Sequence, residues 1–318
     1  MKVLRGLLSA SLLVVGANVA DAHEPPGVTY FLFGFPNHAI PVMDGDTSDW
    51  DMVPEAFWVT REFDFEETVI GNDTEVNLAD FNTKNISGWN EDANKIYTMA
   101  DVVDDFFKRD KEDPSGVDWD DGFDFVVDAD HSGGDLWNGD WHAEEHDDQI
   151  DLVFVSGQNY RYYTPPLDGY YIFMLGRGFV GNDNFLTTGR EILRPEHLAV
   201  GWSMTGTTTG DPNARVYEMK VTPWGNMFRG DDGEARSTIV DLEIGSIIHL
   251  AYMYKDFDSA IEGERYSGSY DFPPLHDTWR NSTLHADFEL LGVDDSLFPT
   301  AVETDTWGRI KSDFVVED

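Results

Sequence analysis

Short runs of alternating apolar and polar residues, separated by clusters of Gly, Asn, Asp and Pro, recur through most of this chain. In one run Tyr217, Met219 and Val221 share one parity, while Glu218 and Lys220 occupy the other. A two-residue period places one set of side chains on a buried sheet face and the other set toward water. Similar runs cover residues 123–127, 150–154, 240–244 and 284–290. The pattern predicts many short strands joined by turns.

Residues 247–254 are apolar at both parities, as expected of a central strand. Helical periodicity is weak, and we expect at most a helical turn in 101–113 and in 190–197. The chain shows no internal repeat of the length that solenoids use. These features predict an all-β fold, an antiparallel β-sandwich of jelly-roll or immunoglobulin-like type with long loop insertions, over residues 23–291.

The N-terminus has the order of a secretory signal peptide. Lys2 and Arg5 precede an apolar stretch at 7–20, which ends in Ala20-Asp21-Ala22, a small-residue cleavage pattern. The sequence therefore predicts a signal peptide over 1–22 and a periplasmic or extracellular protein, with an uncleaved anchor as the alternative. The stretch is short for a bilayer, and no later segment approaches the apolar length of a spanning helix, so we expect no membrane insertion.

The C-terminal residues 292–318 differ in character from the rest of the chain. They are polar and carry an isolated pattern of Val302, Trp307 and Ile310. We expect a C-terminal tail here. A tail docked through Trp307 and a short sorting or interaction segment are the alternatives.

The chain is strongly acidic, with a formal net charge of −40. Such a surface repels nucleic acid and anionic membranes, so neither is an expected partner, whereas divalent cations would neutralise part of the charge. The chain has no cysteine. Disulfides, Fe–S clusters, thiolate zinc sites and covalently attached c-type haem are therefore excluded.

Four segments together carry a family resemblance. They are 40–45 with Asp49-Trp50, 94–99 with Asp104-Asp105, 119–130, and 217–224 followed by the strand 247–254 and Asp256. In this order they resemble the superfamily of family 9 carbohydrate-binding modules, over residues 38–291. The resemblance implies a β-sandwich that binds a sugar end between aromatic side chains. The same superfamily includes b-type haem subunits related to ethylbenzene dehydrogenase.

An Asp-rich loop follows the strand at 123–127. Asp128, Asp130 and Asp135 place oxygen ligands ahead of and around a Gly-Gly turn, with Asp140 as a further candidate. Converging oxygens suit a hard cation, and the spacing departs from that of an EF-hand. The loop predicts a Ca²⁺ site; the alternative is a solvated acidic hairpin loop.

Three tryptophans on or near this loop are the predicted ligand contacts. Trp119, Trp137 and Trp141 would present indole rings on which sugar rings stack, with the N–H available to a hydroxyl. The alternative is that these rings pack over the edge of the sandwich.

Histidines supply weaker metal candidates. His142-Ala143-Glu144-Glu145-His146 fits the H-x-x-E-H zinc signature, yet no apolar helical face surrounds it, so structural or adventitious metal binding is favoured over a catalytic zinc. His23 would become the N-terminal residue after cleavage and would chelate copper if a second histidine such as His38 joined it.

A haem b alternative uses Met99 and Lys220 as axial ligands, a pairing that only the resemblance to the haem subunits suggests. A lysine among carboxylates is more commonly part of a surface ion pair. No nucleophile elbow or phosphate-binding loop is present. Composition leaves a paired-acid glycosidase open, but nothing singles out two carboxylates.

The sequence thus favours a secreted, non-catalytic module that binds a polysaccharide or glycan and is stabilised by calcium. The alternatives are a periplasmic electron-transfer subunit with b-type haem and a structural envelope or extracellular protein without a small ligand. A protein partner stays open in each case.

Overall fold

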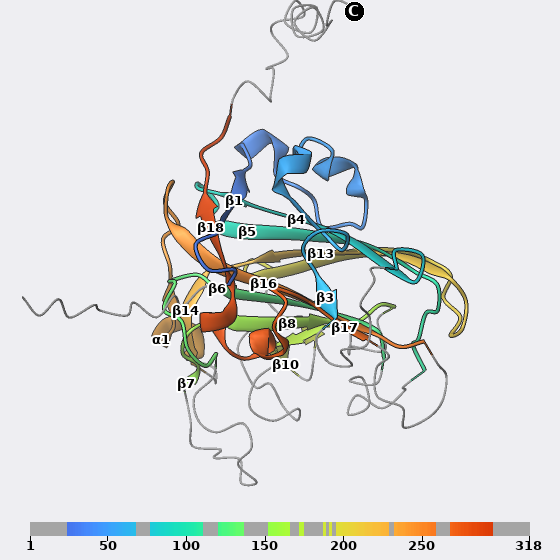
Figure 1. Cartoon of the computed structure of the whole chain (residues 1–318). Helices are drawn as coiled ribbons and strands as arrows, with labels where there is room; N and C mark the ends of the chain where they lie inside the picture. The colour runs from blue at the N-terminus through green and yellow to red at the C-terminus, as the bar shows by residue number, and fades with distance from the viewer. Residues whose placement is uncertain are drawn as a thin grey trace, which may run out of the picture.

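The computed structural model describes residues 24–67, 77–110, 120–136, 152–165, 172–174, 187–188, 191–192, 195–228, 232–258 and 268–294. Within these ranges the chain is built mainly of β-strands, which confirms the predicted all-β, sandwich-like fold (Figure 1). The predicted signal peptide and residues 295–318 of the predicted tail lie outside the described residues.

The first sheet has the order β12-β13-β5-β4-β1. Its strands are β12 (Leu198–Thr205), β13 (Asn213–Val221), β5 (Lys95–Asp104), β4 (Phe81–Asn90) and β1 (Thr29–Gly34), with β2 (Trp58–Thr60) also paired to β4. The pairs from β12 to β4 are antiparallel, whereas β1 runs parallel to β4.

The second sheet continues as β1-β18-β16-β6-β8-β9. Its further strands are β18 (Ala286–Leu290), β16 (Ile247–Asp256), β6 (Gly122–Asp128), β8 (Gln158–Tyr162) and β9 (Ile172–Met174), and β17 (Gly268–Phe272) pairs with both β16 and β3 (Glu66–Glu67). Strand β1 joins the two sheets because residues 29–32 pair with β18 and residues 33–34 pair with β4.

Smaller elements flank the sheets. A three-stranded sheet contains β15 (Thr238–Ile239), β14 (Trp224–Phe228) and β7 (Leu152–Phe154), and β10 (Thr187–Thr188) pairs with β11 (Glu191–Ile192). The helices are short: α1 (Gly233–Arg236) and the 3₁₀ turns η1 (Asn37–Ala39), η2 (Thr47–Trp50), η3 (Glu55–Phe57), η5 (His276–Trp279) and η6 (Ser282–Leu284). None of the helices that the structure describes has the length and apolarity needed to cross a membrane.

Some local predictions were wrong. Residues 101–104 end strand β5, and no helical turn occupies the described part of 101–113. In 190–197, residues 191–192 form β11 and residues 195–197 form a turn. The alternating run at 240–244 is not a strand. Its Val240 N–H donates to Pro223 O at 2.8 Å, and its Leu242 N–H donates to the Asn94 side chain at 3.1 Å. The backbone groups of this run therefore bond to loops instead of to a neighbouring strand.

The main core lies between the two sheets and is rich in aromatic side chains. Strand β4 faces it with Phe81 and Trp89, but also with Thr83, Asn85 and Ser87, which share their parity. These polar side chains find partners across the core: Thr83 Oγ1 donates to Tyr254 OH at 2.9 Å, and Tyr254 OH donates to Asn85 Oδ1 at 2.5 Å. Burying a polar group costs free energy unless it finds a hydrogen-bond partner, and these hydrogen bonds supply the partners.

A second apolar cluster covers the outer face of the first sheet. Ile86 of β4 and Met99 of β5 pack there against Phe35, Trp50 and Val53. The covering segment contains η1, η2 and η3 and lies over β4 and β5 in Figure 1. The segment that contains η1, η2 and η3 therefore packs as a layer on the outer face of β4 and β5. The cleft described next lies between this layer and the two strands.

Candidate functional site

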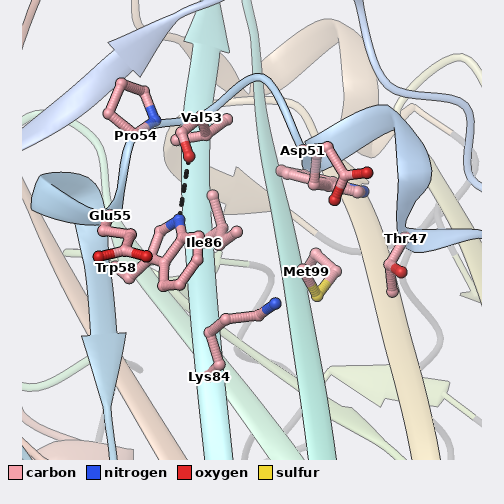
Figure 2. A pocket seen from close by; sticks show the side chains of 10 residues that line it. Thr47, Asp51, Val53, Pro54, Glu55, Trp58, Lys84, Ile86 and Met99 are labelled. Atoms are coloured by element: carbon pink, nitrogen blue, oxygen red, sulfur yellow. Dashed lines mark hydrogen bonds between the residues drawn. The ribbon is translucent and has the colours of Figure 1, made fainter. Parts of the chain in front are cut away.

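A cleft of about 320 Å³ opens between the η2–η3 segment and the outer face of β4 and β5. Its lining consists of Thr47, Trp50, Asp51, Val53, Pro54, Glu55, Trp58, Lys84, Ile86 and Met99. Figure 2 shows Ile86 and Met99 on their strands at the base of the cleft, with Trp58 at one side and Thr47 at the other. The cleft therefore combines an apolar base with polar and aromatic walls.

Trp58 is half-buried and held in a defined orientation. Its indole Nε1 donates to the carbonyl oxygen of Val53 at 3.1 Å, as the dashed line in Figure 2 shows. The Nζ of Lys84 lies 4.8 Å from the centre of the Trp58 ring, a cation–π distance, and 3.7 Å from Asp101 Oδ2. An indole ring positioned before a ligand arrives loses little conformational entropy on binding.

Trp50 forms a buried wall of the cleft and is tied to strand β13. Its Nε1 donates to Glu218 Oε1 at 2.7 Å, while Glu218 Oε2 accepts the backbone N–H groups of Asp44 and Gly45. Burial raises the pKa of the Glu218 carboxyl above its ordinary value, against the lowering effect of these hydrogen bonds. Gly45 has φ +84°, and a Cβ there would lie 2.3 Å from the backbone oxygen of Trp202. The turn at 44–45 therefore requires glycine.

The cleft offers a recognisable set of ligand contacts. An aromatic ring and the side chains of Ile86 and Met99 supply apolar surface, Lys84 supplies a donor, and the exposed Asp51 and Glu55 supply acceptors. Sequence reasoning did not select this site, although Asp49-Trp50 belongs to one of the quoted segments. The convergence of residues 47–58 with two strands distant in sequence is visible only in the fold.

The tryptophans predicted as ligand contacts, Trp119, Trp137 and Trp141, lie outside the described residues. So do Asp140, the predicted fourth calcium ligand, and the histidines of the H-x-x-E-H segment and of the cleavage site, His142, His146 and His23. His38 is exposed on η1.

The three remaining residues of the predicted calcium loop have different environments. Asp128 is buried at the end of β6 and accepts hydrogen bonds from Gly133 N–H at 2.9 Å and from His249 Nδ1 at 2.9 Å. Asp130 and Asp135 are exposed, and Asp135 makes an isolated backbone bridge to Asn281. Among the described residues, these three aspartates do not form a group whose ligand atoms converge within 4.8 Å.

A different set of carboxylates does converge. Asp104 ends β5, Asp121 precedes β6 and Asp256 ends β16, and their oxygens lie within 4.8 Å of one another at one end of the sandwich. All three residues are at most 1% exposed. Asp104 Oδ2 accepts from Arg215 Nη1 at 2.8 Å, and the Asp121 oxygens accept the backbone N–H groups of Lys108 and Phe257.

Asp256 is the unusual member of this cluster. Neither of its carboxylate oxygens has a hydrogen-bond partner among the described residues. Burial, followed by the neighbouring carboxylates Asp104 and Asp121, raises the pKa of Asp256 well above its ordinary value, and burial likewise raises that of Asp121. The Arg215 guanidinium pairs with Asp104 and Asp121, and no ion pair to Asp256 is found among the described residues. The cluster therefore has oxygen ligands and a surplus of carboxylates that a divalent cation would balance.

The haem alternative rests on two residues that share a sheet face. Met99 pairs with Glu218 across β5 and β13, and Lys220 lies two residues further along β13, so both side chains project from the same face. Met99 is fully buried in the second apolar cluster and lines the cleft, while Lys220 is half-buried. Haem binding stays a prediction, which a Soret absorption band would test.

The fold is similar to solved carbohydrate-binding modules. A family 9 carbohydrate-binding module from Caldicellulosiruptor kristjanssonii in complex with cellotriose is 15% identical with a TM-score of 0.46, covering 84% of this chain and 96% of that chain. A family 9 module from the same organism in complex with glucose is 14% identical with a TM-score of 0.43 and the same coverage of 84% and 96%. A candidate carbohydrate-binding protein from Bacteroides uniformis is 9% identical with a TM-score of 0.39, covering 82% of this chain and 98% of that chain.

No protein-family model matches the chain, and no curated protein matches it. Two of the three solved structures belong to the family that the sequence motifs resemble. Because the identities and TM-scores are low, the functional assignment rests on the residues of the cleft.

Proposed function

We propose that this chain is a non-catalytic carbohydrate-binding protein and that the cleft beside Trp58 binds the sugar. The observation that carries the proposal is the half-buried, pre-oriented indole of Trp58 beside a cleft with an apolar base and the polar side chains of Asp51, Glu55 and Lys84. Sugar rings present apolar C–H faces together with a belt of hydroxyls, and this combination of surfaces complements both.

The volume of the cleft limits the size of the ligand that it can bind. Small-molecule sites commonly enclose about 300–1,000 Å³, and the cleft, at about 320 Å³, lies at the lower end of that range. It therefore suits one terminal sugar unit better than a long internal stretch of polysaccharide. Carboxylates of the cleft would accept hydrogen bonds from hydroxyls, and the Lys84 ammonium would donate to a ring or hydroxyl oxygen.

A glycan array tests this function with the full chain, Trp58→Ala and Trp202→Ala. Trp202 is also solvent-exposed but lies on β12 and does not line the cleft, so it controls for the loss of a surface tryptophan. We expect retention of a subset of glycans by the wild type and by Trp202→Ala, and its loss in Trp58→Ala. Equal retention by all three proteins would remove the cleft from the proposal.

The loop tryptophans form a second proposed contact surface. Trp137→Ala and Trp141→Ala, with Trp119→Ala, belong in the same array. Loss of binding in these variants while Trp58→Ala is unaffected would place the sugar site on the acidic loop instead.

The proposal extends to a bound calcium ion and to export. The cluster of Asp104, Asp121 and Asp256 is the stronger candidate for Ca²⁺ because its oxygens converge and those of Asp256 have no hydrogen-bond partner among the described residues. The loop of Asp128, Asp130 and Asp135 is the alternative location. The residues at 1–22 support export to the periplasm or the exterior, where free calcium is abundant enough to occupy a weak site.

A further inference from the structure

Three ligating groups of a different kind meet on the second sheet. The Nε2 of His131 lies 3.0 Å from Asp287 Oδ1, and the Nε2 of His249 lies 3.2 Å from the same oxygen. The two imidazole rings pack against each other with centroids 4.0 Å apart. Two imidazole nitrogens and one carboxylate oxygen thus converge at one point, at the opposite ends of β6 and β16 from the buried Asp cluster.

The backbone holds these groups in place from three adjacent strands. His249 on β16 pairs directly with Asp287 on β18 and, on its other side, with Asp128 on β6. His131 follows β6 in a turn and has φ +55°, a left-handed conformation that is uncommon for a residue with a side chain. The turn therefore directs the His131 ring back over the sheet, toward His249.

Asp128 orients the His249 ring through the Nδ1 atom. The Nδ1 of His249 lies 2.9 Å from Asp128 Oδ2, and because a carboxylate oxygen accepts a hydrogen bond, the Nδ1 carries a proton. A neutral imidazole with its proton on Nδ1 presents a lone pair at Nε2, which faces Asp287 Oδ1. Two lone pairs at this distance repel each other unless a second ring proton or a bound metal ion lies between them. A metal-ligating histidine also commonly donates the N–H of its non-ligating nitrogen to a carboxylate, as His249 does to Asp128.

The spacing fits a small ion. Ligand atoms about 2.0–2.1 Å from a tetrahedral ion lie about 3.3 Å from each other, and the two contacts here are 3.0 and 3.2 Å. A donor set of two imidazoles and one carboxylate suits late first-row ions and not the all-oxygen preference of Ca²⁺ or Mg²⁺.

We propose that His131, His249 and Asp287 bind a late first-row divalent transition-metal ion of the Zn²⁺ class. The His131 side chain is 31% exposed and that of Asp287 is 13% exposed, whereas His249 is buried, so the site opens to solvent on the His131 side. Water would complete the coordination there. The ion would fasten the turn after β6 to the sheet, since His131 is the ligand that the turn contributes.

The test is a zinc titration of the metal-stripped full chain against a chromophoric competitor, with excess Ca²⁺ present to occupy the oxygen-only sites. The key variant is His131→Asn, because asparagine tolerates the left-handed backbone and keeps the turn. His276→Ala, which removes an exposed histidine on η5, is the matched control. A His142→Ala/His146→Ala double variant tests the H-x-x-E-H segment as the source of any binding.

We expect one zinc equivalent in the wild type, in His276→Ala and in the double variant, and affinity about 100-fold weaker or worse in His131→Asn. Asp287→Asn keeps a polar side chain at this partly exposed position and is expected to weaken the affinity for zinc in the same way. Imidazole ¹⁵N spectra of the wild type should show zinc-dependent shifts at two histidines. Absence of zinc binding by the wild type, or an unchanged affinity in His131→Asn with loss in the double variant, would overturn the proposal.

Discussion

The indole Nε1 of Trp50 donates to the Oε1 of Glu218 at 2.7 Å, which ties the wall of the cleft to strand β13. The second oxygen of the same carboxylate accepts backbone N–H groups from Asp44 and Gly45. One buried carboxylate therefore satisfies three donors of the segment that covers the sheet. This side chain therefore helps to hold Trp50, which lines the cleft, in place.

Glu218→Gln tests this role through pH. Burial raises the pKa of Glu218 above its ordinary value of 4.5, so between the two values the folded state binds a proton that the unfolded state lacks. Stability from this group therefore falls as pH rises through that window. The glutamine variant should lose this part of the pH dependence. It should also be less stable by about 1–3 kcal/mol, because an amide nitrogen cannot accept from Asp44 and Gly45 N–H.

Urea denaturation of both proteins across mildly acidic to neutral pH measures the effect. The difference in unfolding free energy between wild type and Glu218→Gln should become smaller as pH rises. A difference that does not change with pH would show that Glu218 is not titrating in this range.

Gly45→Ala should be far more costly than its matched control, Gly245→Ala. Both glycines have nearly the same left-handed backbone, φ +84° and +82°, but a Cβ at Gly45 would lie 2.3 Å from Trp202 O, whereas one at Gly245 meets nothing within 4 Å. The free energy of unfolding of the control should fall by about 1–2 kcal/mol, which is the cost of a left-handed backbone at alanine. The free energy of unfolding of Gly45→Ala should fall by more, and its sugar binding should weaken. Equal losses in chemical denaturation would contradict the close approach.

Asp256→Asn tests the proposed calcium cluster. In EDTA near neutral pH, the variant should melt higher than the wild type. It removes a buried carboxyl that must either carry a charge without a hydrogen-bond partner among the described residues or take up a proton on folding, and both cost free energy. Added Ca²⁺ should raise the melting temperature of the wild type but not of the variant. At about 100 times its dissociation constant the ion adds about 2.7 kcal/mol.

Asp135→Asn provides the contrast for the calcium test, because Asp135 is exposed on the acidic loop. It should keep the full calcium response if the ion binds at Asp256. Loss of the response in Asp135→Asn, with a normal response in Asp256→Asn, would instead place the ion on the loop.

Tyr254→Phe should destabilise the core by about 1–3 kcal/mol. The Tyr254 hydroxyl bonds both Thr83 and Asn85, which are buried and would each lose a partner. Tyr160→Phe is the matched control, since the buried Tyr160 hydroxyl has no hydrogen-bond partner among the described residues. The control should be neutral or stabilising in thermal and urea unfolding. A neutral Tyr254→Phe would mean that water or other groups replace the lost bonds.

Period-two alternation predicted the strands well where a strand faces the core on one side, as in β18, and also in β13, whose second face is covered by the segment that binds Glu218. It misassigned 240–244, where Leu242 is buried but the backbone bonds to Asn94 and Pro223 instead of to a strand. Alternation alone cannot separate these cases, because burial of every second side chain does not require a paired backbone.

The sites were harder to predict than the fold. The cleft beside Trp58 needs a loop to lie across two strands more than twenty residues further along the chain, and the cluster at Asp256 gathers three strand ends. An acidic loop such as 128–135 attracts attention because its ligands are close in sequence. Convergence of distant residues leaves no comparable local pattern.

The most direct test of the central claim is calorimetric titration of the full chain with the glycan that the array selects, repeated with Trp58→Ala and Trp202→Ala. Binding that is weakened at least about tenfold in Trp58→Ala, with Trp202→Ala matching the wild type, is the result predicted for a stacking ring, which is worth about 1–3 kcal/mol. Undiminished affinity in Trp58→Ala, with folding verified, would contradict it.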